Sequence, residues 1–197
     1  MPMPSAYETR SEAFFRLYEG ETPQEIQTLL TRWIPKGSRV LELGCGSGRD
    51  ARFMSGLDAI VEATDGSGPL LKLAEARAQA LLGAESPSFS LLCLPPDKAS
   101  EDALFARLPR FDAVYTCGVL QHLSDHELYE GACFMERAVT DKGTLIVVVP
   151  LDHKGDPDRK TFLRDSLDYA TLFERMGFRL ASQEIRDGVG SPGHECR

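Results

Sequence analysis

The sequence predicts an α/β protein whose doubly wound, mostly parallel sheet carries helices on both faces. Short apolar segments of strand length alternate along the chain with segments of helical period, as in a parallel sheet with helical crossovers. Gly44, Gly46 and Gly48 directly follow the first apolar segment, at the end of a strand where such sheets bind ligands. The length of 197 residues, 42% of them hydrophobic, suits a single core.

The N-terminal part is expected to be irregular over residues 1–10 and then helical. Residues 22–25 read as a capping box with proline at the first helical position. An apolar stripe of helical spacing follows, formed by Ile26, Leu29, Leu30, Trp33 and Ile34. We therefore divide the chain into an N-terminal helical cap, residues 1–36, and a ligand-binding domain, residues 37–197.

Each predicted strand is a short apolar run that ends in glycine, proline or polar residues. In chain order the predicted strands are residues 40–43, 59–64, 89–94, 111–116, 144–149 and 178–185. The run within 144–149 contains three consecutive valines, which is typical of a strand buried on both faces.

The predicted helices lie between these strands and have an apolar stripe or a start or stop signal. Gly83 ends the second of them, and residues 124–127 form another capping box. In chain order the helices are 49–55, 69–82, 101–108, a helix after Ser124 with the stripe Leu128, Ala132, Met135 and Val139, and a helix marked by Tyr169, Leu172, Phe173 and Met176.

Charge and cysteine content exclude several classes of function. The net charge is −8 and the densest basic stretch, residues 158–160, is short, so no basic face for a nucleic acid is expected. The five cysteines are scattered without a CxxC pair, which argues against a disulfide framework or a metal site. The longest apolar run, residues 145–151, is too short to span a bilayer, and the N-terminus lacks a signal-peptide pattern. We expect a cytoplasmic protein without a membrane partner.

The glycine-rich turn and Asp65 form the strongest functional signal. Glycines permit a tight turn and close approach to a ligand, and the following helix offers unpaired N–H groups to an anion. Asp65 ends the second predicted strand about 20 residues after Gly44, where a carboxylate can accept hydrogen bonds from ribose hydroxyls. Together they predict a site for an adenosine-containing ligand, and the alternative is a glycine-rich turn beside a surface aspartate.

The glycine spacing indicates which ligand of this kind is bound. A dinucleotide fingerprint needs a third glycine where the chain has Arg49, and no P-loop motif is present. The stretch VLELGCGSGRD, residues 40–50, resembles motif I of class I S-adenosylmethionine-dependent methyltransferases. The resemblance covers most of residues 40–185 and includes the family's second, fourth and fifth strand regions in 61–77, 111–123 and 141–150.

The resemblance implies a Rossmann-like methyltransferase fold with S-adenosylmethionine as cofactor. The cofactor-binding residues that it implies are Glu42, Gly44, Cys45 and Gly46 around the methionine portion, Gly48 in the same turn, Asp65 at the ribose, Gly66 and Ser67 at the adenine, and Cys117 and Val119 at the methyl group. Where the family has a carboxylate for the adenine amino group, this chain has Leu94 or Pro95, with Asp97 further on.

His122 is the candidate catalytic residue. Methyl transfer from a sulfonium is an in-line displacement that depends on alignment, and a base is needed only when the acceptor loses a proton. His122 follows the fourth predicted strand, and the alternative is that it only packs there. Pairing with His126 on a metal is excluded because Ser124 caps the helix between them. The polar residues 151–165 are a candidate lid or substrate loop.

Tyr7, Phe14, Phe15 and Tyr18 precede the first predicted helix and allow two interpretations. Aromatic faces can stabilise a sulfonium cation in a segment that covers the site. Alternatively, these side chains only provide the apolar packing of a helix. Cys117 is interpreted as a small packing residue because no neighbouring base is evident.

The sheet is expected to lack the family's last strand, because residues 186–197 contain no apolar segment. An open sheet edge favours association, so a homodimer is a hypothesis. The predicted function is methyl transfer to a small-molecule acceptor, without nucleic acid as a partner. The alternatives are a non-catalytic S-adenosylmethionine-binding protein and an NAD-dependent oxidoreductase, against which Arg49 argues.

Overall fold

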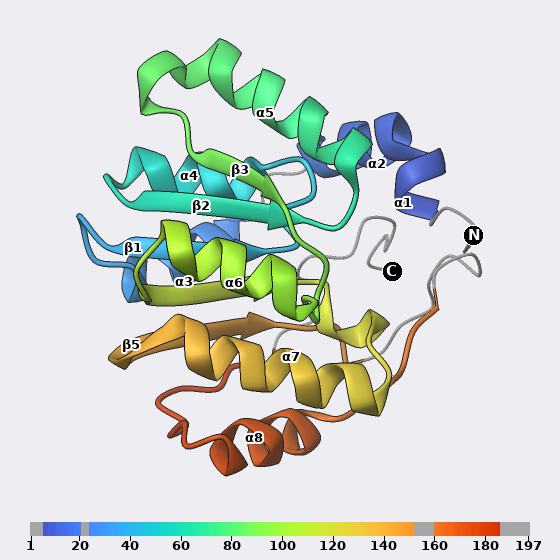
Figure 1. The fold of residues 1–197 in the computed structure, drawn as a ribbon, viewed down its shortest axis with the longest axis vertical. Helices are drawn as coiled ribbons and strands as arrows, with labels where there is room; N and C mark the ends of the chain where they lie inside the picture. Colours follow the sequence, from blue (N-terminus) through green and yellow to red (C-terminus); the bar gives the residue numbers. More distant parts are fainter. Residues whose placement is uncertain (1–5, 21–23, 152–159, 186–197) are drawn as a thin grey trace.

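The computed structural model describes residues 6–20, 24–151 and 160–185. Its centre is a five-stranded parallel sheet with the strand order β3-β2-β1-β4-β5 (Figure 1). The strands are β1 (Arg39–Leu43), β2 (Ile60–Asp65), β3 (Ser88–Leu91), β4 (Phe111–Cys117) and β5 (Val139–Val148). The predicted doubly wound α/β fold is confirmed.

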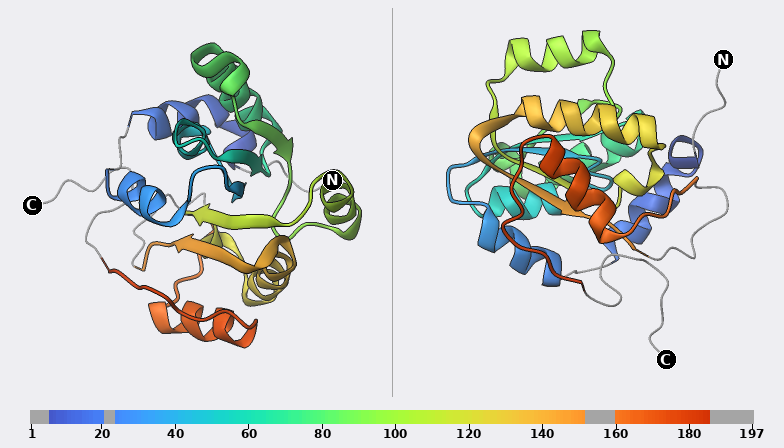
Figure 2. Two further views of the ribbon diagram at one scale, coloured as in Figure 1. Left: turned by 90° about the vertical axis from the view of Figure 1, so that its left-hand side faces the viewer. Right: turned by 90° about the horizontal axis from the view of Figure 1, so that it is seen from below.

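Helices cover both faces of the sheet (Figures 1 and 2). Apolar residues of α3, α4 and α5 pack on one face, and those of α6, α7 and α8 pack on the other. Tyr115 and Phe134 are the largest fully buried side chains of the two layers. The helices are α1 (Ala6–Thr9), α2 (Ser11–Glu19), α3 (Gln24–Trp33), α4 (Arg49–Gly56), α5 (Gly68–Leu82), α6 (Lys98–Arg107), α7 (Asp125–Ala138) and α8 (Ser166–Arg175), with short 3-10 turns η1 (Gly83–Glu85) and η2 (Leu120–His122).

Strand register brings the ends of the three central strands to one edge. Leu43 at the end of β1 pairs with Thr64 of β2 and with Thr116 of β4. The chain leaves β1 between its two neighbours, which makes this point the topological switch at which ligands bind in such sheets. Helices α1 and α2 lie beyond the same edge (Figure 1).

The N-terminal segment is more ordered than expected. Residues 6–9, predicted to be irregular, form α1. α1 and α2 contact α5, whereas α3 contacts α4. Residues 21–23, which include the first two residues of the predicted capping box before α3, lie outside the described residues. The division into residues 1–36 and 37–197 stays a prediction.

The predicted burial of β5 on both faces is wrong. Only Val139 and Ile146 of this strand are buried. Within the described ranges, β5 pairs with β4 alone, so it is an edge strand, and Val147 and Val148 are only half-buried.

The predicted strand at residues 178–185 is also wrong. This segment has no regular secondary structure, because no neighbouring strand in the described part of the chain offers it hydrogen-bond partners. Phe178 packs edge-on against Phe173 at 6.0 Å between ring centroids. Leu180 and Ile185 remain 51% and 66% exposed, so these apolar side chains contribute little to the core. β3 likewise ends at Leu91, earlier than predicted.

No helix of the described residues is both long and apolar enough to cross a membrane. Residues 152–159 of the candidate lid lie outside the described ranges.

Candidate functional site

The glycine-rich turn follows β1 and faces both the loop after β4 and helix α2. Gly44 and Gly46 have φ angles of 75° and 56°, a left-handed conformation that favours glycine. A Cβ on Gly44 would overlap Val119, and one on Gly46 would lie 3.1 Å from the ring of Tyr18. The N–H of Gly44 donates to the Thr64 carbonyl at 2.8 Å, which ties the turn to β2.

Asp65 lies between the glycine turn and the start of α5. Its Oδ2 accepts a hydrogen bond from the Gly46 N–H at 2.9 Å, and its Oδ1 accepts one from the Ser67 N–H at 2.8 Å. Burial raises the pKa of Asp65, although the bonds from Ser67 and Gly46 oppose the shift. Because each carboxylate oxygen has two lone pairs, Asp65 can accept further donors from a ligand.

Glu42 is a buried carboxyl at the floor of the site. It is 3% exposed, and its Oε2 has no hydrogen-bond partner among the described residues. Burial raises the pKa of Glu42 well above its ordinary value, and the neighbouring carboxylates of Asp50 and Asp65 raise it further. An unsatisfied buried acceptor is costly, so this atom fits a donor supplied by a ligand.

Asp50 and Arg49 form a polar link behind the glycine turn that the sequence analysis missed. Asp50 accepts hydrogen bonds from the Tyr115 hydroxyl at 2.8 Å and from Arg49 Nε at 2.9 Å. Arg49 Nη1 also donates to the Tyr18 carbonyl at 3.2 Å. Arg49, which stands where a dinucleotide fingerprint has its third glycine, therefore connects α4 to α2.

The loop after β3 contains the residues that the resemblance places near the adenine, and their role in binding it stays a prediction. Leu94 packs towards α7, where its Cγ lies 3.4 Å from the Cβ position of Gly131. The Cys93 sulfur, which the sequence analysis did not single out, lies 3.4 Å from the Cβ position of Gly66. Asp97 caps α6 by accepting from the Ser100 N–H at 2.8 Å.

Polar contacts hold α1 and α2 over the site. The Ser67 hydroxyl donates to the Tyr7 carbonyl at 3.1 Å. Glu19 at the end of α2 forms ion pairs with Arg52 of α4 at 2.5 Å and with Arg77 of α5 at 3.5 Å. The Glu19 and Arg52 side chains are only 19% and 11% exposed, so solvent screens this pair weakly.

The N-terminal aromatic residues combine packing with contact to the site. The Tyr7 and Phe14 rings are 4.7 Å apart, and the Phe14 and Tyr18 rings are 6.0 Å apart. Phe14 is buried and Phe15 half-buried, as expected for helix packing. Tyr7 contacts His122 and Tyr18 lies beside Gly46, and a role of these rings towards a sulfonium cation stays a prediction.

His122 connects the cap with the loops after β4 and β5. Its Nδ1 lies 2.8 Å from the Lys160 carbonyl oxygen, which can only accept, so the neutral ring carries its hydrogen on Nδ1. The lone pair of Nε2 then faces the Tyr7 hydroxyl at 3.1 Å and the Gln121 side-chain nitrogen at 3.2 Å. The arrangement presents an acceptor nitrogen, the requirement for a general base.

The other side chains considered for a chemical role, Cys117 and His126, show no sign of one. Burial raises the pKa of Cys117 to about 12, which keeps the thiol neutral and agrees with a packing role. His126 pairs with Glu130 at 3.4 Å on the surface of α7. The described residues contain no cluster of three or more side chains suited to a metal ion.

Comparisons with known proteins agree with this geometry. A family model described as a methyltransferase domain matches residues 41–145. The chain is 32% identical over 114 residues to the ubiquinone biosynthesis O-methyltransferase of Thiobacillus denitrificans, a match that covers 55% of this chain and 46% of that protein. The chain thus spans about half the length of the curated relative that it matches.

Solved structures show the same fold at low sequence identity. One belongs to the complex between the Haloferax volcanii Trm112 methyltransferase activator and a putative methyltransferase, with a TM-score of 0.73, 17% identity and coverage of 92% of this chain and 80% of that one. Another is the magnesium protoporphyrin IX methyltransferase of Synechocystis with bound S-adenosylmethionine, with a TM-score of 0.64, 20% identity and coverage of 87% and 74%.

Proposed function

This chain belongs to the methyltransferase-domain family, whose fold binds S-adenosylmethionine, and from that membership we propose that it methylates a hydroxyl oxygen of a small molecule. The observation that carries the proposal is the orientation of His122, whose Nδ1 faces the Lys160 carbonyl and whose Nε2 faces the Tyr7 hydroxyl as a hydrogen-bond acceptor. A base at this position is useful only for an acceptor that must lose a proton.

The residues of the site fit S-adenosylmethionine. The unpartnered Glu42 Oε2 would accept from the ammonium of the methionine portion. Asp65 would accept from the ribose hydroxyls, and the glycine turn leaves room for close approach of the backbone. When bound, this cofactor supplies an electrophilic methyl group, whose in-line transfer breaks the sulfur–carbon bond as the oxygen–carbon bond forms.

The chain's own residues would orient the acceptor and remove its proton. His122 Nε2 would take the proton from the acceptor hydroxyl, while the Lys160 carbonyl stabilises the Nδ1–H. Tyr7 already places a hydroxyl 3.1 Å from Nε2, which supports a hydroxyl as the group that this nitrogen recognises. The cap would exclude water and align the reacting atoms.

Two further observations support a small hydroxylated acceptor. The curated relative from Thiobacillus denitrificans is named as an O-methyltransferase of ubiquinone biosynthesis. The net charge of −8 is unfavourable for a polyanionic nucleic acid. The acceptor that we propose is therefore a small molecule with an acidic hydroxyl, such as a phenol.

The test combines cofactor binding with turnover. We expect calorimetry to detect binding of S-adenosylmethionine and Asp65→Ala to weaken it by at least about 10-fold, since charge-assisted hydrogen bonds contribute roughly 1.5–3 kcal/mol each. A panel of small phenols with methyl-labelled S-adenosylmethionine should yield a labelled ether. His122→Gln should lower kcat by about 100-fold or more and leave cofactor affinity unchanged.

The matched control is His126→Gln, because His126 lies on the exposed surface of α7 and should leave kcat unchanged. Binding without transfer to any acceptor in the panel would favour a non-catalytic S-adenosylmethionine-binding protein. Failure to bind S-adenosylmethionine would overturn the proposal.

A further inference from the structure

We infer that Arg164 is a positioning residue that fixes the orientation and the protonated nitrogen of His122. It lies in residues 160–164, the described segment before α8, and contacts Leu123 in the loop between β4 and α7 and Asp125 at the start of α7. The catalytic consequence rests on the proposed function, but the structural consequence does not.

Hydrogen bonds join the segment 160–164 to the loop between β4 and α7. Residues 160, 162 and 164 each bond to one of the residues 121–123. They are the His122 Nδ1–H to the Lys160 carbonyl at 2.8 Å, the Phe162 N–H to the Gln121 carbonyl at 2.7 Å, and Arg164 Nη2 to the Leu123 carbonyl at 2.8 Å. The position of the Lys160 carbonyl therefore depends on how this segment is held.

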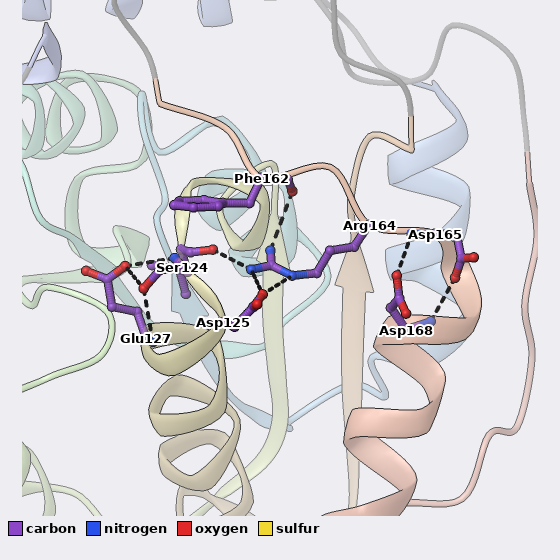
Figure 3. Close-up of polar contacts among 8 residues, drawn as sticks. Ser124, Asp125, Glu127, Phe162, Arg164, Asp165 and Asp168 are labelled. Atoms are coloured by element: carbon purple, nitrogen blue, oxygen red, sulfur yellow. Dashed lines mark hydrogen bonds and ion pairs between the residues drawn. The ribbon is translucent and has the colours of Figure 1, made fainter.

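Arg164 is the side chain that holds it. The guanidinium also donates to Asp125 Oδ1 from Nη2 at 2.7 Å and from Nε at 3.1 Å, and to the Phe162 carbonyl at 3.5 Å (Figure 3). Its side chain is 9% exposed, whereas that of Asp125 is 96% exposed. An ion pair with an exposed carboxylate contributes little to stability. The buried hydrogen bond from Arg164 to the Leu123 carbonyl is therefore expected to be the main contact that holds the segment.

The hydrogen bond between Arg164 and Leu123 lies next to the N-termini of two helices. The Ser124–Glu127 capping box begins α7, and the Asp165–Asp168 capping box begins α8 (Figure 3). Leu123 and Arg164 directly precede these caps, so the bond between them fixes two helix N-termini relative to each other.

Phe162 completes the attachment. The Lys160 ammonium lies 4.8 Å from the centroid of its ring, and the Arg164 guanidinium lies 5.5 Å from the same centroid. Cation–π contacts of this kind favour the conformation that keeps residues 160 and 164 close to the ring. Arg164 thus orders the segment through side-chain stacking as well as through carbonyl groups.

The consequence is control of the His122 tautomer. A carbonyl at Nδ1 selects the ring with hydrogen on Nδ1 and a lone pair on Nε2. Without that carbonyl, the ring can carry its hydrogen on Nε2, which then cannot accept the proton of an acceptor hydroxyl. Arg164 would act on the reaction through His122 without touching the reacting atoms.

The primary test reads the tautomer directly. The ¹⁵N chemical shifts of His122 in the full-length wild-type chain should show a protonated Nδ1 and an unprotonated Nε2. In Arg164→Ala we expect a mixture of tautomers. The control Arg137→Ala removes a comparable arginine–carboxylate pair, with Glu101 at 2.6 and 2.9 Å on the far end of α7, and should leave the His122 shifts unchanged.

Arg164→Lys guards against loss of folding, since it keeps the charge but cannot reproduce the forked contacts. Both Arg164 variants should lower kcat by about 10-fold with little change in KM. Asp125→Asn should change kcat far less, because Asp125 is exposed.

An unchanged tautomer in folded Arg164→Ala or Arg164→Lys would overturn the inference, even if kcat fell. Absence of turnover in the wild-type chain would instead contradict the proposed function, while the ¹⁵N shifts would still decide the role of Arg164.

Discussion

At the scale of single residues, Glu42 connects stability with ligand binding. Its carboxyl is buried without a partner for Oε2 among the described residues, and burial raises its pKa well above the value of 4.5 expected in an unfolded chain. As pH rises past that value, the unfolded chain releases its proton before the folded one. Rising pH therefore favours unfolding through this residue.

We expect Glu42→Gln to raise Tm at neutral and alkaline pH, because a neutral amide avoids the cost of the buried carboxylate. The gain should shrink as pH falls towards 4.5 and vanish below that value, where wild-type Glu42 is protonated in both states. The same variant should weaken binding of S-adenosylmethionine. Thermal melts across pH and calorimetry test both effects, and a gain in Tm that is independent of pH would contradict the explanation.

Local sequence patterns predicted some residues of the site better than others. Gly44, Gly46 and Asp65 lie together as predicted, because consecutive strands of a parallel sheet end at one edge. The contact of Tyr7 with His122 and the role of Arg164 join residues far apart in the chain. Neither has a local signature, because both depend on how separate loops meet after folding.

At the scale of elements, the glycine turn and the loop after β4 fit each other closely. Gly44 has a φ of 75°, which costs a residue with a Cβ roughly 1–2 kcal/mol, and its Cβ would also overlap Val119. The turn therefore has two separate reasons for glycine.

We expect Gly44→Ala to reduce the free energy of unfolding by about 2–4 kcal/mol, from backbone strain and overpacking together. Adding Val119→Ala should recover the steric part, while the backbone part remains. Chemical denaturation of the two single variants and the double variant measures this coupling. Strict additivity would show that the clash with Val119 does not contribute.

The strands differ in how well sequence predicts them. β1 and β4 agree with their apolar runs because both are central and buried. Residues 178–185 also contain apolar side chains, but the described residues provide no neighbouring strand for them, and Leu180 and Ile185 remain exposed. A strand is a property of a pair, so its own sequence cannot show that the partner is absent.

At the scale of the whole molecule, the described residues leave β5 at an edge of the sheet. Exposed strand edges offer unpaired backbone groups to another chain. The homodimer expected from the sequence therefore stays a prediction, and the surface through which it would form is the exposed edge of β5.

Sedimentation velocity should show a monomer–dimer equilibrium that shifts with protein concentration. Hydrogen exchange of the β5 amides should slow as the dimer forms, since strand pairing protects them. β3, at the opposite edge of the sheet, provides the internal control and should exchange at a constant rate. A single monomeric species at every concentration, or equal protection of both edges, would contradict dimerisation through β5.

The position of Tyr18 beside Gly46 has a kinetic consequence. A nucleoside bound at the glycine turn would lie next to α2. Glu19 at the end of α2 forms ion pairs with Arg52 of α4 and Arg77 of α5. We expect these ionic contacts to open when the nucleoside enters and departs, so that release of the demethylated nucleoside, rather than the chemical step, limits the rate of each catalytic cycle.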